Sequence, residues 1–416
     1  MPNEMEIFER HESNIRAYCR AVPTVFKSSV NAIMIDENNK EYIDFFAGAG
    51  VLNFGHNNRK MKKAMIEFLE KDGVAHSLDM YTDVKREFIK KFVNTILKPR
   101  NMDYKMQFTG PTGTNAVEAS LKLARKATGR ENIVAFNRGF HGMTLGSLAC
   151  TANQAFRGAS GVSLNNVIRD TFNDMDSLNK LRQKFEDRGS GLMPPAAFML
   201  EVVQAEGGVR VGEKEWLQGV QKLAKDLCAL FIIDDIQAGC GRTGSYFSFD
   251  DLGLDPDIII LAKGLGGYGT PIGMLLNKPG LDSNWKPGEH TGTFRGQGLS
   301  FVAGKIGLEY FDNDNLMNEV RQKGSYIKIR LLELQKKYPK LKIRAKGMIL
   351  AMEFSSAQIA KKIASKCFNK GLIIGACSTG EILKFIPPLT IEHSILEKGM
   401  NIFMEACNEV LDKEEN

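Results

Sequence analysis

The sequence predicts an α/β protein whose central part contains a mainly parallel β-sheet, and two observations support this fold class. From about residue 114 to residue 276, short apolar segments alternate with longer amphipathic ones, which is the strand–helix–strand order of a parallel sheet. The short segments are continuous apolar runs rather than alternating ones. Such runs are typical of strands that are covered on both faces.

The elements of this central part follow in order. A helix over residues 114–129 has Val117, Leu121 and Ala124 on one face and ends at Gly129, a residue suited to a left-handed cap. A second amphipathic helix, over residues 215–229, leads directly into a strand. The expected strands occupy residues 132–136, 196–203, 230–234, 257–263 and 271–276.

The two ends of the chain have a different pattern. Residues 24–46 predict a small β-meander whose hairpin turns between Asp36 and Lys40. After about residue 311 helical patterns dominate, and a strand-rich segment follows them. We therefore expect a large α/β domain over residues 55–310 and a smaller α+β domain made from residues 1–54 and 311–416.

The composition limits the function classes. The 416 residues carry a formal charge of +6 without a dense basic run, which argues against a nucleic-acid partner. Seven scattered cysteines form no C-x-x-C pair, as in a reducing compartment. Residues 1–20 lack the apolar core of a signal peptide, and no apolar run reaches membrane-spanning length. Histidines spaced unlike metal ligands argue against a metal site. We expect a cytoplasmic protein with no membrane partner.

Two adjacent acids, Asp234 and Asp235, follow the apolar strand in the segment "FIIDDIQAGCGRTG". Burying a carboxylate is unfavourable unless it is paired. Strand side chains alternate between faces, so only one of the two acids can face a given site. A carboxylate at this strand end could hold a protonated ring nitrogen, or it could accept the amides of the next loop; the stretch alone leaves both open.

A lysine, Lys263, ends the next apolar strand. It is either a solvent group at the strand end or a catalytic amine, because a partly desolvated lysine loses its proton more easily and becomes a nucleophile. Residues 264–269 match the G-x-G-x-x-G pattern of dinucleotide sites, but a strand rather than a helix follows them. The helix N-terminus that would receive a pyrophosphate is therefore missing.

Two glycine-containing segments complete the pattern. Gly113 and Thr114 open the first helix, where free amides and a hydroxyl could hold a phosphate; a plain helix cap by Thr112 or Thr114 is the alternative. Phe140 and His141 lie between glycines just after a strand, where the aromatic ring could cover a planar ligand or simply pack in the loop. Pyridoxal 5'-phosphate requires these features together: a phosphate cradle, a stacking ring, a carboxylate and an amine.

The chain resembles the class III (ω-) aminotransferases, of fold type I among pyridoxal-phosphate enzymes, over nearly all of its length. The motifs "TGTNAVEA", "GFHG", "EVVQAEGG", "IDDIQAGCGRTG", "LAKGLG" and "HTGTFRG" carry this likeness. The resemblance implies a seven-stranded, mainly parallel sheet and a homodimer or higher homo-oligomer with shared active sites.

The resemblance also implies residue roles. Lys263 would carry the cofactor and move the proton, and Asp234 would pair with the ring nitrogen. Gln237 would contact the ring hydroxyl, and Thr293 would reach the phosphate of the neighbouring subunit. The implied cofactor-binding residues are Gly113, Thr114, Phe140, His141, Asp234, Gln237, Lys263 and Thr293.

The substrate residues implied by the resemblance are Glu206 and the basic residue that pairs with it. Many members of the class have an arginine just before "PPLTI", whereas this chain has Lys384 in "LKFIPPLTI". A lysine lacks the planar fork that grips a carboxylate, so Arg295 is an alternative carboxylate partner.

Within the class, the segments "FAGAGVLNFGHN", "DDIQAGCGRTG" and "WKPGEHTGTFRG" most resemble enzymes that transfer the 4-amino group of L-2,4-diaminobutyrate to 2-oxoglutarate, a type that serves ectoine and some siderophore pathways. The expected products are L-aspartate 4-semialdehyde and glutamate. Another ω-amine donor, such as 4-aminobutyrate or acetylornithine, is an alternative, and so is a pyridoxal-phosphate mutase or decarboxylase on the same fold.

Overall fold

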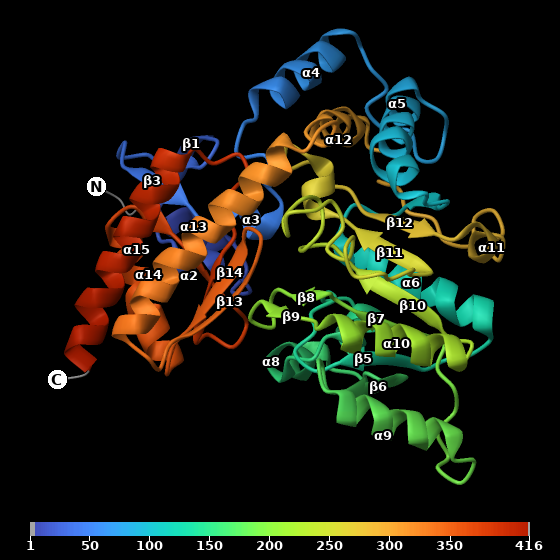
Figure 1. Cartoon of the computed structure of the whole chain (residues 1–416). Coiled ribbons are helices and arrows are strands. Elements are labelled where there is room, and N and C mark those ends of the chain that lie inside the picture. The colour runs from blue at the N-terminus through green and yellow to red at the C-terminus, as the bar shows by residue number, and fades with distance from the viewer. Residues whose placement is uncertain (1–4, 415–416) are drawn as a thin grey trace.

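A seven-stranded sheet forms the centre of the larger lobe in the computed structural model, which describes residues 5–414 (Figure 1). Its strand order is β4-β12-β11-β10-β7-β5-β6. β12 runs antiparallel to both of its neighbours, and the other pairs are parallel. The predicted mainly parallel, seven-stranded sheet is thus confirmed. Its strands are β4 (Lys105–Phe108), β5 (Ile133–Phe136), β6 (Val167–Asp170), β7 (Ala197–Leu200), β10 (Leu230–Asp234), β11 (Ile258–Leu261) and β12 (Met274–Asn277).

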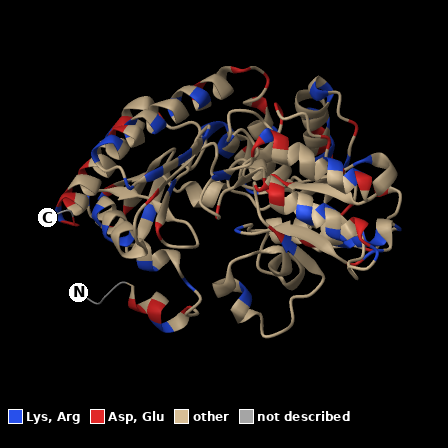
Figure 2. Cartoon of the chain, turned by 60° about the horizontal axis from the view of Figure 1, so that its bottom comes forward, with Lys and Arg blue, Asp and Glu red and all other residues tan. Residues whose placement is uncertain are grey.

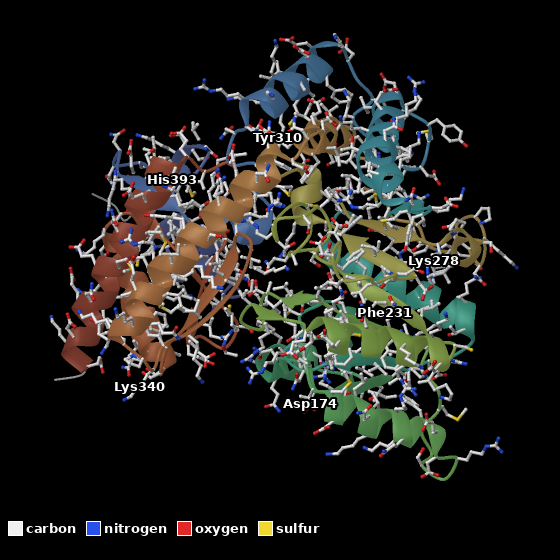
Figure 3. All side chains as sticks on the ribbon, in the orientation of Figure 1. Asp174, Phe231, Lys278, Tyr310, Lys340 and His393 are labelled. Carbon is white, nitrogen blue, oxygen red and sulfur yellow. The ribbon has the colours of Figure 1, made fainter. Side chains whose placement is uncertain are left out.

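Helices cover both faces of this sheet, which explains the continuous apolar runs of its strands. Ile232 of β10 packs in the cluster that contains α6 (Gly113–Thr128). Phe231, labelled in Figure 3, packs with α10 (Lys214–Asp226) on the opposite face. α9 (Met175–Glu186) lies beside α10, and Asp174, also labelled in Figure 3, caps it by accepting the Ser177 N–H at 2.9 Å.

The smaller lobe combines the two ends of the chain in two four-stranded sheets. One has the order β1-β2-β3-β15, in which the C-terminal strand β15 pairs in parallel with the N-terminal strand β3. The other has the order β13-β14-β17-β16. The limits at residues 54 and 310 stay a prediction, and the outermost residues 1–4 and 415–416 lie outside the described chain. The strands are β1 (Phe26–Val30), β2 (Ile33–Asp36), β3 (Glu41–Asp44), β13 (Lys342–Lys346), β14 (Ile349–Glu353), β15 (Leu372–Ile373), β16 (Gly375–Ala376) and β17 (Ile382–Phe385).

The other elements complete the two lobes. α12 packs on α4 and α5 at the top of Figure 1, and the short β8–β9 hairpin lies between the large sheet and β13. Within residues 5–414, no helix combines the length and apolarity needed to cross a bilayer. These elements are α1 (Glu6–His11), α2 (Tyr18–Ala21), α3 (Ala47–Gly50), α4 (Arg59–Glu70), α5 (Asp83–Phe92), η1 (Val93–Leu97), η2 (Lys98–Arg100), α7 (Leu145–Cys150), α8 (Gln154–Arg157), η3 (Gly158–Ser160), β8 (Val203–Gln204), β9 (Arg210–Val211), η4 (Lys263–Gly266), α11 (Pro279–Asp282), α12 (Gly298–Glu309), α13 (Asn315–Lys337), α14 (Ala357–Asn369) and α15 (His393–Glu414).

Arg242 joins the two lobes from the loop after β10. It is fully buried, and its guanidinium donates to the carbonyl oxygens of Met348 and Pro387 and to Oδ1 of Asn53. These partners belong to the smaller lobe and to the segment that leads out of it. On the outer helices, by contrast, Lys and Arg alternate with Asp and Glu (Figure 2). Buried hydrogen bonds to a charged group are stronger than such surface pairs, so Arg242 fixes the packing of the lobes.

Candidate active site

The two adjacent acids at the end of β10 point to opposite faces of the sheet. Asp234 is 4% exposed, and its Oδ2 is hydrogen-bonded to Nδ1 of His141 at 2.8 Å, while Oδ1 accepts the Ile236 N–H at 3.2 Å. Asp234 therefore accepts an amide of the following loop, which is one of the two alternatives left open by the sequence, and it also faces a buried imidazole. Its pairing with a ring nitrogen of a ligand stays a prediction.

Asp235 serves the other face. Its Oδ2 accepts the Ser248 N–H at 3.1 Å, and burial raises the pKa of its carboxyl to about 7. The charged groups that shift the pKa of Lys263 are Glu206, Lys384, Asp234 and Glu201. Asp234, but not Asp235, thus belongs to the cluster around that lysine, as strand alternation requires.

Lys263 begins the η4 turn directly after β11. Its φ of +49° lies in the left-handed region, which is uncommon for a residue with a side chain and frequent at functional sites. Burial lowers the pKa of its amine to about 8, although the carboxylate of Glu206 pulls in the opposite direction. No hydrogen bond or ion pair holds this amine among residues 5–414. An amine in this state is available as a nucleophile near neutral pH.

The N-terminus of α6 offers an anion site. Thr112 is the N-cap, and the amides of Gly113 and Thr114 have no acceptor in the part of the chain that the structure describes. A Cβ at position 113 would lie 2.9 Å from Cδ1 of Ile236, so a larger residue there would require the Ile236 side chain to move. Gly142 has φ +128°, and a Cβ there would lie 2.4 Å from Oγ1 of Thr114. Exposed amides at a helix start suit a phosphate.

Phe140 and His141 lie on the loop after β5, between this helix start and Asp234. The Phe140 ring is half-buried and forms an edge contact with Phe156 at 5.9 Å between centroids. The backbone N–H of Phe140 donates to Oε1 of Glu201 at 2.9 Å. The sequence interpretation missed Glu201, which stands alone at the end of β7.

Glu201 is a buried acid that holds two segments of the site. Its second oxygen accepts the Ala205 N–H at 3.2 Å, next to Glu206. Burial raises the pKa of Glu201 to about 7, although His141 pulls it down, and Asp234 adds to the rise. In the sequence, Glu201 directly follows four apolar residues, Ala197–Leu200. An acid directly after an apolar run is the pattern that had singled out Asp234.

Gln237 lies where the large lobe meets the α3 segment of the smaller lobe. Its Nε2 donates to the Ala49 carbonyl at 2.7 Å, and its Oε1 accepts from Nζ of Lys384 at 3.1 Å. All four residues of α3, 47–50, have positive φ, from +47° to +85°. Such strained backbone is held only where its surroundings fix it, and here it presents the Ala49 carbonyl to Gln237.

Glu206 and Lys384 form a buried ion pair. The Lys384 side chain is 1% exposed, and that of Glu206 is 21% exposed. Burial alone would raise the pKa of Glu206, but the ammonium groups of Lys384 and Lys263 outweigh it and hold that pKa below its ordinary value. The same pair reaches Tyr18, whose pKa is raised by burial and by the charge of Glu206. Sequence reasoning missed Tyr18, which has no motif of its own.

Thr293 and Arg295 lie on an exposed loop, away from the residues that surround Lys263. The Thr293 carbonyl is hydrogen-bonded to Nε2 of His76 at 2.5 Å. The neighbouring Gly292 lies close to the amide of Gly110, since a Cβ built there would be 3.2 Å from that nitrogen. Arg295 forms an ion pair with Asp79 at 2.5 Å. The structure thus engages Arg295 elsewhere and gathers the other substrate residues, Glu206 and Lys384, next to Lys263.

The donor set fits pyridoxal phosphate. A phosphate would be held by the free amides at the start of α6, beside Gly142, where a Cβ would lie 2.4 Å from Oγ1 of Thr114. A buried carboxylate and an amine of lowered pKa stand at the ends of neighbouring strands, β10 and β11. These are the groups that the cofactor's ring nitrogen and aldehyde need.

Comparison with known proteins agrees with this site. The family model "Aminotransferase class-III" matches residues 17–407. A "Diaminobutyrate--2-oxoglutarate transaminase" of Halalkalibacterium halodurans is 46% identical, over 99% of this chain and 98% of its own length. Proteins of the same name are 47% identical in Sporosarcina pasteurii, over 98% of both chains, and in Wolinella succinogenes, over 99% of this chain and 98% of the relative.

Solved structures show the same fold at lower sequence identity. The ornithine aminotransferase of Toxoplasma gondii ME49 matches with a TM-score of 0.87 at 23% identity, covering 98% of this chain and 95% of that one. A transaminase of the marine bacterium Virgibacillus matches with a TM-score of 0.88 at 20% identity, covering 98% and 99%. The chain belongs to the class-III aminotransferases, which are enzymes that use pyridoxal phosphate.

Proposed function

We propose that this aminotransferase transfers the 4-amino group of L-2,4-diaminobutyrate to 2-oxoglutarate, reversibly, and so produces L-aspartate 4-semialdehyde and glutamate. The observation that carries the choice of substrates is the likeness, along the whole chain, to relatives named for this reaction at 46–47% identity. The buried Glu206–Lys384 pair supports it, since it offers both a carboxylate and a cation beside Lys263.

The residues around the cofactor have distinct roles in this proposal. When bound, pyridoxal phosphate supplies the aldehyde carbon that carries the amino group and a ring that accepts electron density from the reacting carbon. Lys263 would hold the cofactor through its amine, and the same amine would move a proton to and from the reacting carbon. Asp234, fixed by His141, keeps the ring nitrogen protonated. Gly113 and Thr114 bind the phosphate, Phe140 stacks on the ring, and Gln237 contacts the ring hydroxyl.

Glu206 and Lys384 adapt the site to two different substrates. The reacting carbon of diaminobutyrate carries no carboxylate, so the Lys384 ammonium stays paired with Glu206 while the donor is bound. The reacting carbon of 2-oxoglutarate carries a carboxylate, which takes the place of Glu206 as the partner of Lys384. The buried Lys384 ammonium thus has an anionic partner in both halves of the reaction.

We also infer a homodimer or higher homo-oligomer in the cytoplasm, in which Thr293 completes the phosphate site of the neighbouring subunit. Thr293 is exposed, and its loop adjoins that of His76, whose ring contacts Phe294 at 5.5 Å. Exposed apolar groups of this kind mark association surfaces. The exposed apolar side chains on these loops and on the segment after Phe140 are Val74, Leu78, Met80, Tyr81, Met143, Leu145 and Phe294.

A donor panel tests the reaction. With 2-oxoglutarate as acceptor, purified enzyme is expected to convert 2,4-diaminobutyrate faster than 4-aminobutyrate or acetylornithine, with glutamate formed in equal amount. A faster rate with either of the other donors would overturn the proposed donor. Without an oxoacid the enzyme should stop after one turnover, whereas continued turnover would point to a mutase or decarboxylase.

A further inference from the structure

A cavity of about 290 Å³ opens beside the candidate active site. Phe140 forms one part of its wall, and Gly207, the residue after Glu206, forms another. The loop between β16 and β17 closes it from the smaller lobe through Ser378 and Thr379. Phe140 is a candidate cofactor-binding residue and Gly207 is the chain neighbour of Glu206, so the cavity adjoins the candidate site, and it is large enough for one arm of a small substrate.

Arg138 supplies the charge of this cavity. Its side chain lines the wall and is exposed, and its φ is +62°. Within residues 5–414, its guanidinium has no hydrogen bond and no ion pair. Two further arginines lie nearby, since burial and the charges of Arg138 and Arg344 together lower the pKa of Arg210. Glu353 and Glu381 act on Arg210 in the opposite direction.

The neighbouring cations are already engaged. Arg344 is paired with Glu353 at 2.7 Å and donates to the Gly208 carbonyl. The Nε of Arg210 donates to the Gly207 carbonyl at 3.2 Å. Lys384 is bound to Glu206, and Arg295 to Asp79. Among residues 5–414, Arg138 is thus the arginine that lines the cavity wall, and neither a hydrogen bond nor an ion pair competes there with an anion for its guanidinium.

The backbone of Arg138 is fixed against the loop that carries Glu206. A Cβ at position 207 would lie 2.5 Å from the Arg138 carbonyl oxygen and 3.1 Å from its Cβ. Only glycine at this position allows so close an approach. Arg138 is thereby held against Gly207, the residue after Glu206. Asn153, which donates to the Ser378 carbonyl at 3.3 Å, links the larger-lobe and smaller-lobe walls of the cavity.

The chemistry of the two substrates points to a single anion subsite. In 2,4-diaminobutyrate the carboxylate carbon is three carbon–carbon bonds from the reacting carbon. In 2-oxoglutarate the distal carboxylate carbon is also three carbon–carbon bonds from the reacting carbon. One cation placed at that separation serves both halves of the reaction, and a guanidinium can hold the carboxylate with two parallel hydrogen bonds.

We propose that the cavity beside Phe140 is the subsite for this shared carboxylate and that Arg138 is the residue that binds it. The proposal rests on the proposed function for the identity of the donor. It makes Arg138 a specificity-determining residue, distinct from Lys384, which receives the carboxylate attached to the reacting carbon.

The test compares substrates with and without the carboxylate in Arg138→Gln. In single turnovers the second-order rate constant of the variant should fall by about 10- to 100-fold with 2,4-diaminobutyrate. It should change little with 1,3-diaminopropane, which lacks only the carboxylate. The aminated enzyme should show the same contrast between 2-oxoglutarate and 2-oxopentanoate. Calorimetry should show weaker binding of glutarate. Arg210→Gln removes a neighbouring charge outside the cavity wall, so it is the matched control and should keep both preferences.

Two results would overturn the subsite. One is an equal loss in Arg138→Gln on both members of each substrate pair, and the other is a loss of preference in Arg210→Gln as large as that in Arg138→Gln. Failure of the proposed function looks different. If the wild-type enzyme does not convert 2,4-diaminobutyrate, the donor is wrong, while the acceptor pair and glutarate binding still decide the role of Arg138.

Discussion

The two ends of the active site are built in different ways. At the ring end, Asp234 and Lys263 stand at the carboxyl ends of the neighbouring strands β10 and β11, which pair along three residues of one rigid sheet. At the substrate end, Glu206 and Arg138 lie on loops of the larger lobe, and Lys384 lies on β17 of the smaller lobe. The ring end depends on one sheet, whereas the substrate end depends on how two lobes pack.

This difference separates chemistry from specificity. Strand ends in a sheet hold side chains to within a fraction of an ångström, as a reaction centre requires. Loops at a lobe boundary tolerate substitution, and they determine which substrates fit. Substitutions at the ring end should therefore remove turnover with every substrate, and those at the substrate end should change the ranking of substrates.

The largest effect is expected from Lys263→Ala. Loss of the amine removes both the covalent hold on the cofactor and the proton transfer, so turnover should fall by about 10⁴-fold or more with every donor. Lys278→Ala is the matched control, because Lys278 follows β12 and forms ion pairs with Asp255 and Asp257. It should leave turnover intact. After borohydride reduction, mass spectrometry should find the pyridoxyl mass on Lys263; finding it on another lysine would refute the assignment.

The second largest effect is expected to distinguish Asp234 from Asp235. Asp234→Asn leaves the ring nitrogen without its anion, so turnover should fall by about 10²- to 10³-fold while the cofactor still binds. Asp235→Asn should keep its activity, because Asp235 contacts Ser248 on the opposite face and burial already raises the pKa of its carboxyl to about 7. Kinetics and cofactor absorbance of both variants provide the measurement. The reverse pattern would mean that the faces of β10 are exchanged.

The ring end was predictable because its signals are local. Apolar runs that stop at Asp234 and Lys263 gave the strands and their carboxyl ends, and the parallel order placed those ends together. Gly113 and Thr114 were predictable because a helix start has free amides whatever surrounds it.

The substrate end was not predictable in the same way. Arg138 carries no motif, and its importance depends on Gly207 and Thr379, which are distant in sequence. Glu201 was missed because it lies inside the strand predicted over residues 196–203. Only the structure ends that strand at Leu200 and shows the bonds of Glu201 to Phe140 and Ala205. Arg295 was considered as a carboxylate partner because it lies in a motif, but the motif does not reveal that Arg295 forms an ion pair with Asp79.

A smaller effect is expected at the boundary between subunits. Thr293→Ala removes one hydrogen bond to a charged phosphate, so cofactor binding should weaken by roughly 1.5–3 kcal/mol. Mixed dimers of a Lys263→Ala chain with a Thr293→Ala chain reveal which site is affected. If the sites are shared, both defects fall in one site and the other binds cofactor as the wild type does. A weakened site that retains its own Lys263 would mean that Thr293 acts within its own chain, beside Gly110.

The smallest effect is expected from pH, and it tests whether the ring end is as desolvated as its burial implies. Burial lowers the pKa of Lys263 to about 8. Only the neutral amine attacks the cofactor aldehyde, so the rate of apoenzyme reconstitution should rise about tenfold per pH unit below 8 and level off above it. The sign for stability follows from the same shift. Between pH 8 and about 10.5 the unfolded lysine keeps a proton that the folded one has lost, so the contribution of Lys263 to stability rises with pH. Lys263→Met should therefore stabilise the apoenzyme more at pH 7 than at pH 10, relative to wild type. A reconstitution midpoint near pH 10, with no such difference in the unfolding free energies, would show that Lys263 titrates as a solvated amine.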